Sequence, residues 1–196
     1  MCIRDRYWHL HSATAISVGY YKVARVLMIP DDKARAAELR FLRSSLAKLQ
    51  KITPAALDPE TRTDRAVLEN QLAGEIWYLT DFRDWQWDPS LYNVAEPFAL
   101  LLNTDYAPLE VRLRDVLERL SNVPAYYAAA KSSVKNPTRE HTQLAIEQNS
   151  GTLEVFGPEL EQQIAGSTLT PRERALLTQR IAAARTAISD LSLIHI

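Results

Sequence analysis

The sequence of 196 residues contains a single cysteine, Cys2, and only five glycines. One thiol cannot form an internal disulfide or a cysteine-based zinc site, so neither of these features is available. The sequence has no glycine-rich phosphate loop and no Gly-x-Ser-x-Gly elbow, which excludes the nucleotide-binding and serine-hydrolase classes that need them. The net charge of −1 gives no electrostatic case for nucleic acid as a partner. No apolar run approaches the roughly 20 residues of a membrane-spanning segment.

The first and last six residues, MCIRDR and LSLIHI, resemble peptides translated from sequencing-adapter DNA. We therefore expect residues 1–6 and 191–196 to lie outside the natural protein and to contribute nothing to folding. Residues 7–190 are then expected to form the N-terminal helical part of a larger protein, and this part has no cysteine. The cellular location of the protein, cytoplasmic or exported, stays open.

Apolar residues recur at three- and four-residue spacing along most of the chain, as in Leu39, Leu42, Leu46 and Leu49. The same pattern recurs later in Leu109, Leu113, Val116, Leu117 and Leu120. This spacing is typical of amphipathic helices, and no comparable two-residue alternation is present. The pattern predicts helices over residues 8–19, 31–50, 59–83, 93–103, 108–122, 125–134, 138–164 and 171–190. The predicted fold class is all-α, an irregular up-and-down array of about eight helices that forms part of a larger helical protein.

Polar residues mark the expected starts of three helices. Asp58 before Pro59 is typical of a cap followed by the first helical position. Thr170 and Glu173 have the spacing of a reciprocal capping pair, and Thr138 is a third candidate cap. Inside the helix predicted over 138–164, a break or bend is expected at one or more of three residues: Gly151, Gly157 and Pro158.

Four segments between Trp85 and Gly151 occur in an order and spacing that resemble the DUF885 family of bacterial proteins. They are WQWDPSLY (Trp85–Tyr92), DYAPLEVRL (Asp105–Leu113), RLSNVPAYYAAAK (Arg119–Lys131) and PTREHTQLAIEQNSG (Pro137–Gly151). The stretch from Tyr7 to Asn70 resembles the family less closely. The resemblance covers most of residues 7–190, which would be about the first third of a family member.

Members of this family resemble helical zinc metallopeptidases that carry a His-Glu pair and a Pro-Gly-His segment in the C-terminal half. Neither segment occurs here. The resemblance implies that this chain shapes a peptide-substrate cleft in an intact zinc-dependent peptidase and is inactive alone. The implied partners are the missing C-terminal half and a peptide substrate. No cofactor is expected in this segment, whereas zinc is expected in the intact parent. The alternative is a non-catalytic helical scaffold or protein-interaction module.

No residue of the chain is expected to be catalytic or to bind a metal. Zinc-binding histidines on a helix lie four residues apart, whereas His9 and His11 lie two apart and His141 stands alone. We interpret them as surface or hydrogen-bonded histidines. Three acidic residues, Asp81, Asp84 and Asp88, lie close together in the sequence. We interpret them as a solvated acidic face at a helix end, with Asp88 starting a turn before Pro89, rather than as an acid–base pair.

Aromatic residues with polar edges are concentrated between Trp77 and Tyr127. Such rings suit packing between helices, and they also suit the wall of a peptide-binding cleft. Both interpretations stay open. The candidate substrate-binding residues are Trp87, Tyr92, Asn93 and Tyr106.

Overall fold

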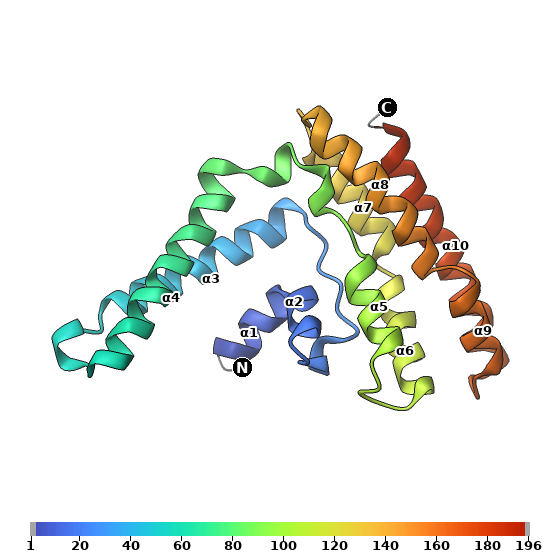
Figure 1. Ribbon diagram of the computed structural model, residues 1–196, viewed down its shortest axis with the longest axis horizontal. Helices are drawn as coiled ribbons and strands as arrows, with labels where there is room; N and C mark the ends of the chain where they lie inside the picture. The colour runs from blue at the N-terminus through green and yellow to red at the C-terminus, as the bar shows by residue number, and fades with distance from the viewer. Residues whose placement is uncertain (1–2, 195–196) are drawn as a thin grey trace.

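The computed structural model describes residues 3–194, which fold into α-helices joined by short connections (Figure 1). The α-helices are α1 (Ile3–Leu10), α2 (Ser12–Ser17), α3 (Asp32–Gln50), α4 (Pro59–Trp77), α5 (Ala95–Asn103), α6 (Leu109–Leu120), α7 (Val123–Ser133), α8 (Arg139–Val155), α9 (Pro158–Gly166) and α10 (Pro171–Ile194). Short 3-10 helices lie at Tyr21–Val23, Pro54–Ala56, Asp84–Gln86 and Pro89–Leu91, and a π-helical turn lies at Tyr78–Phe82. No strand occurs within residues 3–194, so the all-α prediction is confirmed.

Side-chain caps form at the three predicted helix starts. Asp58 accepts a hydrogen bond from Thr61 N at 2.9 Å, and Thr138 accepts one from the backbone three residues later at 3.3 Å. Glu173 N donates to Thr170 Oγ1 at 3.2 Å, while Thr170 N donates to Glu173 Oε2 at 2.8 Å. These bonds satisfy amide groups that have no acceptor inside their own helix.

The helix predicted over 138–164 is divided into α8 and α9 at Gly157. A Cβ atom at Gly157 would lie 2.9 Å from the carbonyl oxygen of Glu154, so a larger residue would force the chain apart here. Gly151 stays inside α8 and causes no break. The expected interruption is therefore confirmed at Gly157 and wrong at Gly151.

Two other predicted helices differ from regular α-helices in the structure. The helix predicted over 8–19 is divided at His11 into α1 and α2. The helix predicted over 59–83 continues from α4 into the π-helical turn and ends at Arg83, whose φ of 51° is left-handed. A non-glycine residue rarely adopts this conformation, and here it separates the π-helical turn from the short helix at Asp84–Gln86.

The helices form two parts, shown in Figure 1 as an arm and a body. The arm is the hairpin of α3 and α4, and the body contains α5 to α10, with α1 and α2 between the two parts. Helix α4 has no buried residue, and α3 buries only Phe41 and Leu42. Most of the hydrophobic core therefore lies in the body.

Helix α6 is a main contributor to the core of the body. Its predicted apolar stripe is buried from Leu113 to Leu120. Besides Arg112, the same helix buries two further charged residues, Asp115 and Arg119. Buried charges are costly unless they are paired or hydrogen-bonded, so the partners of these two residues explain their position.

Arg119 has no exposed surface, and its guanidinium donates hydrogen bonds to the backbone carbonyls of Ala24, at 3.4 Å, and Val26. Burial lowers the pKa of Arg119 to about 10, which still leaves the group charged near neutral pH. Its carbon Cζ lies 5.7 Å from the centre of the Phe98 ring. The side chain thus satisfies carbonyl groups in the irregular connection between α2 and α3.

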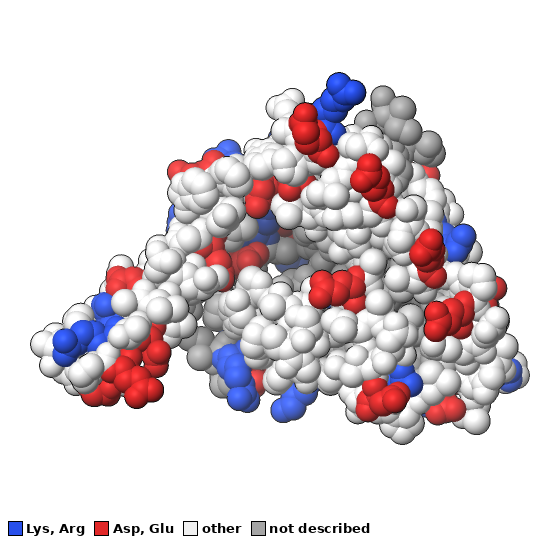
Figure 2. Space-filling model, in the orientation of Figure 1, with Lys and Arg blue, Asp and Glu red and all other residues white. Residues whose placement is uncertain are grey.

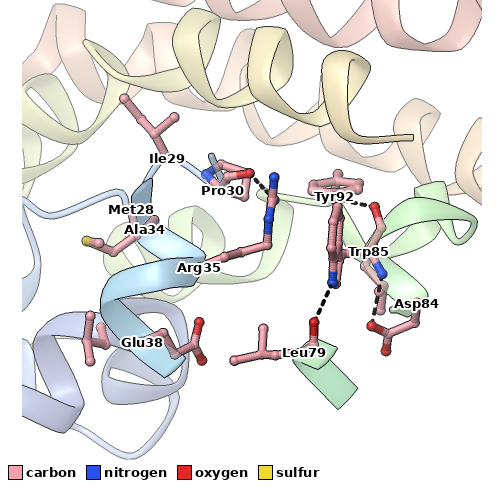
Figure 3. Close-up of a pocket in the computed structure, with 12 residues that line it drawn as sticks. Met28, Ile29, Pro30, Ala34, Arg35, Glu38, Leu79, Asp84, Trp85 and Tyr92 are labelled. Carbon is pink, nitrogen blue, oxygen red and sulfur yellow. Dashed lines mark hydrogen bonds between the residues drawn. The ribbon is translucent and has the colours of Figure 1, made fainter. Parts of the chain in front are cut away.

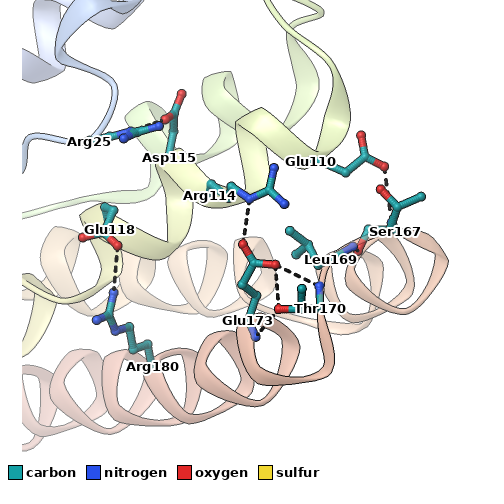
Figure 4. Close-up of polar contacts among 11 residues, drawn as sticks. Arg25, Glu110, Arg114, Asp115, Glu118, Ser167, Leu169, Thr170, Glu173 and Arg180 are labelled. Atoms are coloured by element: carbon teal, nitrogen blue, oxygen red, sulfur yellow. Dashed lines mark hydrogen bonds and ion pairs between the residues drawn. The ribbon is translucent and has the colours of Figure 1, made fainter.

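Two neighbouring side chains hold the same connection. Asn122, just after α6, donates from Nδ2 to the carbonyl of Leu27 at 3.3 Å. Asp115 accepts a hydrogen bond from Arg25 Nε at 2.7 Å (Figure 4). We refer to Asp115, Arg119 and Asn122 together as the α6 clamp.

On its other side, α6 is tied to α10 and to the turn before it (Figure 4). Arg114 Nε lies 2.7 Å from Glu173 Oε1, at the start of α10. Arg180 donates from Nη1 to the carbonyl of Leu117 at 2.7 Å. Since ion pairs this exposed contribute little to stability, the apolar stripe of α6 is the main source of its packing energy.

Both terminal hexapeptides make contacts in their described parts. Leu191 is 1% exposed and belongs to the core, so the expectation that the closing hexapeptide contributes nothing to packing is wrong at this residue. Asp5 accepts a hydrogen bond from Tyr20 OH at 2.8 Å. Residues 1–2 and 195–196 lie outside the described part of the chain, and the boundaries at residues 7 and 190 stay a prediction. None of the described helices is long and apolar enough to cross a membrane.

We expect Leu113→Ala and Leu117→Ala each to lower the free energy of unfolding by about 2 to 5 kcal/mol, because each change removes buried apolar surface and leaves a cavity. Denaturant titration measures this change. The matched control is Val111→Ala on the exposed side of α6, for which the change should stay within about 0.5 kcal/mol. Equal effects at all three positions would contradict the assigned core.

Candidate functional site

A cavity of about 240 Å³ lies where the arm joins the body; we call it the junction cavity (Figure 3). Its walls come from the end of α1, the connection before α3, the first turns of α3 and the segment between the π-helical turn and α5. The lining residues are Leu10, Met28, Ile29, Pro30, Ala34, Arg35, Glu38, Leu79, Asp84, Trp85, Leu91 and Tyr92. An apolar wall with a few polar groups is the usual composition of a ligand pocket.

Arg35 is held in the first turn of α3, which begins where Asp31 accepts a hydrogen bond from Ala34 N at 2.7 Å. The Arg35 guanidinium donates to the carbonyl of Pro30 and, at 3.1 Å, to the hydroxyl of Ser133 in α7. Its carbon Cζ lies 4.1 Å from the centre of the Trp85 ring. This one side chain therefore links the arm, the body and the loop between them.

Trp85 and Tyr92 are fixed by hydrogen bonds to the backbone of the same region. Trp85 Nε1 donates to the carbonyl of Leu79 at 3.4 Å, and Tyr92 OH donates to the carbonyl of Trp85 at 2.6 Å (Figure 3). Burial raises the pKa of Tyr92, so the hydroxyl stays protonated and able to donate. These hydrogen bonds hold the aromatic wall in one position, which lowers the cost of binding a ligand.

Glu38 lies one turn after Arg35, with its carboxyl group toward the junction cavity (Figure 3). Burial, together with the nearby Glu75 carboxylate, raises the pKa of Glu38 to about 7. His11 Nε2 lies 3.5 Å from Glu38 Oε1, but burial lowers the pKa of His11. Near neutral pH His11 is therefore mostly neutral, while Glu38 is divided between its protonated and its ionised form, so the two groups do not form a full ion pair. Glu38 can exchange a proton in this pH range.

The three acidic residues between the end of α4 and α5, Asp81, Asp84 and Asp88, lie in three different environments. Asp81 is exposed, as expected. Asp84 lines the junction cavity and accepts a hydrogen bond from Trp85 N at 2.9 Å, while burial raises its pKa. Asp88 is buried and accepts from Ser90 N at 2.9 Å, which starts the short helix at Pro89. The prediction that Asp88 starts a turn before Pro89 is therefore confirmed, whereas the prediction that it lies on a solvated face is wrong, because the side chain is buried.

Of the four candidate substrate-binding residues, Tyr92 lines the junction cavity and the other three lie elsewhere. Trp87 Nε1 donates to the carbonyl of Phe82 at 3.2 Å. Asn93 Oδ1 accepts from Ala95 N at 2.7 Å, before α5.

The fourth candidate, Tyr106, stacks on Tyr21 with ring centres 4.0 Å apart and donates to Asp115 at 3.0 Å. Burial raises the pKa of its hydroxyl. Tyr106 therefore packs beside the α6 clamp. A role in substrate binding stays a prediction for all four residues.

Sequence reasoning missed Arg35 and Glu38. A signal was present for Glu38, because it precedes Leu42 by one helical turn and so places a carboxyl group on the edge of the predicted apolar stripe of α3. No local signal marks Arg35, since its partners Trp85 and Ser133 are distant in sequence.

The donor groups do not fit a catalytic zinc site. Such a site needs three protein ligands, and the described residues contain no group of three His, Cys, Asp or Glu side chains that could hold a metal ion. His11 approaches Glu38 alone, and His141 Nε2 lies 3.6 Å from Asp88 Oδ2. The Nδ1 atom of His141 lies 2.5 Å from Thr138 Oγ1, which confirms the interpretation of a hydrogen-bonded histidine. We therefore assign no step of metal-assisted hydrolysis to these residues.

Comparisons with known proteins match nearly the whole chain. A family model described as bacterial protein of unknown function, DUF885, matches residues 13–192. A solved structure from Shewanella oneidensis, described as a candidate lipoprotein of unknown function, is 39% identical and superposes with a TM-score of 0.94. The similarity covers 98% of this chain but only 35% of that one. No curated protein matches the chain.

We expect the pH dependence of stability to change in the variant Glu38→Gln. The unfolded chain releases the Glu38 proton near the ordinary value of 4.5, whereas the folded chain keeps it up to about 7. Wild-type stability contributed by this group is therefore present at low pH and is lost as pH rises through this window. Relative to wild type, the variant should gain stability between about pH 5 and about pH 8, as measured by denaturant titration. An exposed control, Glu140→Gln, should show a much smaller change, and identical pH profiles for wild type and Glu38→Gln would refute the assignment.

Proposed function

Because the chain belongs to the DUF885 family of bacterial proteins, we propose that it forms the N-terminal helical wall of a peptide-substrate cleft in a larger, zinc-metallopeptidase-like protein. The observation that carries this proposal is the junction cavity, where aromatic and aliphatic side chains surround a few polar groups. Clefts between helices are a common position for ligands. In this role Trp85 and Tyr92 would contact substrate side chains, and Glu38 would exchange a proton or accept a hydrogen bond.

The proposal places the metal centre in the remainder of the intact polypeptide. This chain spans about a third of the length of the solved relative, so most of that protein lies outside the compared region. The resembling family carries its His-Glu and Pro-Gly-His segments in the C-terminal half. Without three suitable donors in the described residues, this chain alone is expected to retain no stoichiometric zinc.

A second candidate function is a non-catalytic helical scaffold or protein-interaction module. The observation that favours it is the set of exposed apolar side chains on the arm, which includes Val67, 62% exposed, and Leu68, 53% exposed. Such surfaces are typical of sites that bind other proteins.

Elemental analysis separates the two candidates. We expect a dialysed full-length polypeptide that contains this segment to hold about one zinc per chain and to hydrolyse peptides, and this chain alone to do neither. One zinc per copy of this chain would contradict our assignment of the ligands. A folded, metal-free, full-length protein would favour the scaffold.

The role of the cavity wall is tested in the same full-length protein with Trp85→Ala. We expect an increase of several-fold in KM, with nearly unchanged kcat and zinc content, because the ring would bind substrate without taking part in chemistry. The matched control is Trp77→Ala, an exposed tryptophan that does not line the junction cavity. Equal effects of the two substitutions would count against the proposed wall.

A further inference from the structure

A second hollow, of about 550 Å³, lies between α1 and the α3–α4 arm. Its lining is mostly apolar and includes Trp8, Phe41, Leu49, Ile52, Leu68 and Leu72. We call this surface the arm groove. It shares no lining residue with the junction cavity, so it is a separate site.

Large apolar side chains of the arm groove are in contact with solvent. Ile52 is 45% exposed and Leu68 is 53% exposed. Burying such a side chain fully contributes about 1.5 to 3 kcal/mol, and that contribution is absent while the groove is open. A contiguous surface of this kind is typical of an interface.

Glu75, which lines the arm groove, has its carboxylate held by neighbouring residues of the chain. Glu75 Oε1 accepts hydrogen bonds from Gln71 Nε2 at 2.7 Å and from Tyr7 OH at 3.5 Å. The other oxygen, Glu75 Oε2, is shielded from solvent and has no hydrogen-bond partner among the described residues. Because this oxygen is shielded by the chain itself, an occupant of the groove would contact the apolar side chains and not this atom.

The solved relative indicates where this occupant comes from. Its chain contains the same fold at a TM-score of 0.94, yet the aligned region is only 35% of its length. Most of its polypeptide is therefore available to pack on the helices shared with this chain. Helix-in-groove packing needs an amphipathic helix whose apolar face matches the groove.

We infer that the arm groove is the docking site for a helix from the remaining polypeptide of the full-length protein. This helix would place apolar side chains against Ile52 and Leu68. The inference rests on family membership and packing, and it does not depend on zinc or peptidase activity. The arm would then be fixed by two contacts: one with the body at its end and one with this helix along the groove.

The test compares amide hydrogen exchange in α4 between two proteins: this chain alone and a chimera that joins it to the remaining polypeptide of the Shewanella oneidensis protein. We expect exchange in α4 to slow by at least ~10-fold in the chimera, because docking suppresses local opening. In the chimera, Leu68→Gln should abolish this protection. The matched control, Ala66→Gln, changes an exposed residue of α4 outside the groove and should leave it intact.

Unchanged exchange in α4 on joining the two parts would overturn the inference. Sedimentation tests whether a second copy of this chain is the occupant. If this chain self-associates, and if Leu68→Gln abolishes the association while Ala66→Gln preserves it, the docking inference would also be overturned. If the chimera does not fold, the full-length Shewanella oneidensis protein is compared with its own segment that matches this chain. We then expect the helix corresponding to α4 to be protected only in the full-length protein. A full-length protein in which amide exchange in α4 is slowed but which holds no zinc would refute the peptidase proposal alone. A full-length protein that holds zinc but in which exchange in α4 is not slowed would refute the docking site alone.

Discussion

The position of the arm depends on the hydrogen bonds between the buried Arg119 guanidinium and the backbone carbonyls of Ala24 and Val26. The connection from α2 to α3 has almost no regular structure, so its carbonyl groups need donors from elsewhere. Arg119 supplies them from α6, whose apolar stripe anchors it in the body. The α6 clamp therefore determines where α3 begins, and through α3 it determines the direction of the whole arm.

Both candidate surfaces follow from that placement. The start of α3 brings Arg35 over Trp85 and turns Glu38 toward the junction cavity, while the far part of α3 pairs with α4 to form the arm groove. Figure 2 shows a hollow between the arm and the body, with acidic side chains at its edge. One surface has the composition of a ligand site and the other that of a packing site. In a full-length protein, an arm docked along its groove would keep the junction cavity rigid, which favours binding.

The sequence correctly predicted features of the fold that depend on residues close together in the chain. The caps at Asp58 and Thr170, the apolar stripe of α6 and the break at Gly157 depend on residues within a turn or two, and each was predicted correctly. The candidate site was predicted only at Tyr92, because the environments of Arg35 and Glu38 are created by residues far away in the chain. Asp88 was misinterpreted for the same reason, since its burial comes from tertiary packing.

The most direct measurement is the distribution of distances between spin labels on the arm, at Ala47, and on the body, at Ala128, in a Cys2→Ser background. Both positions are exposed, so the labels disturb little packing. We expect a single narrow arm-to-body distance distribution in the otherwise unchanged protein and a broad one in Arg119→Met. A control pair of labels inside the body, at Ala128 and Ala183, should give a narrow distribution in both proteins. An arm-to-body distribution that remains narrow in Arg119→Met would contradict the central role of the α6 clamp.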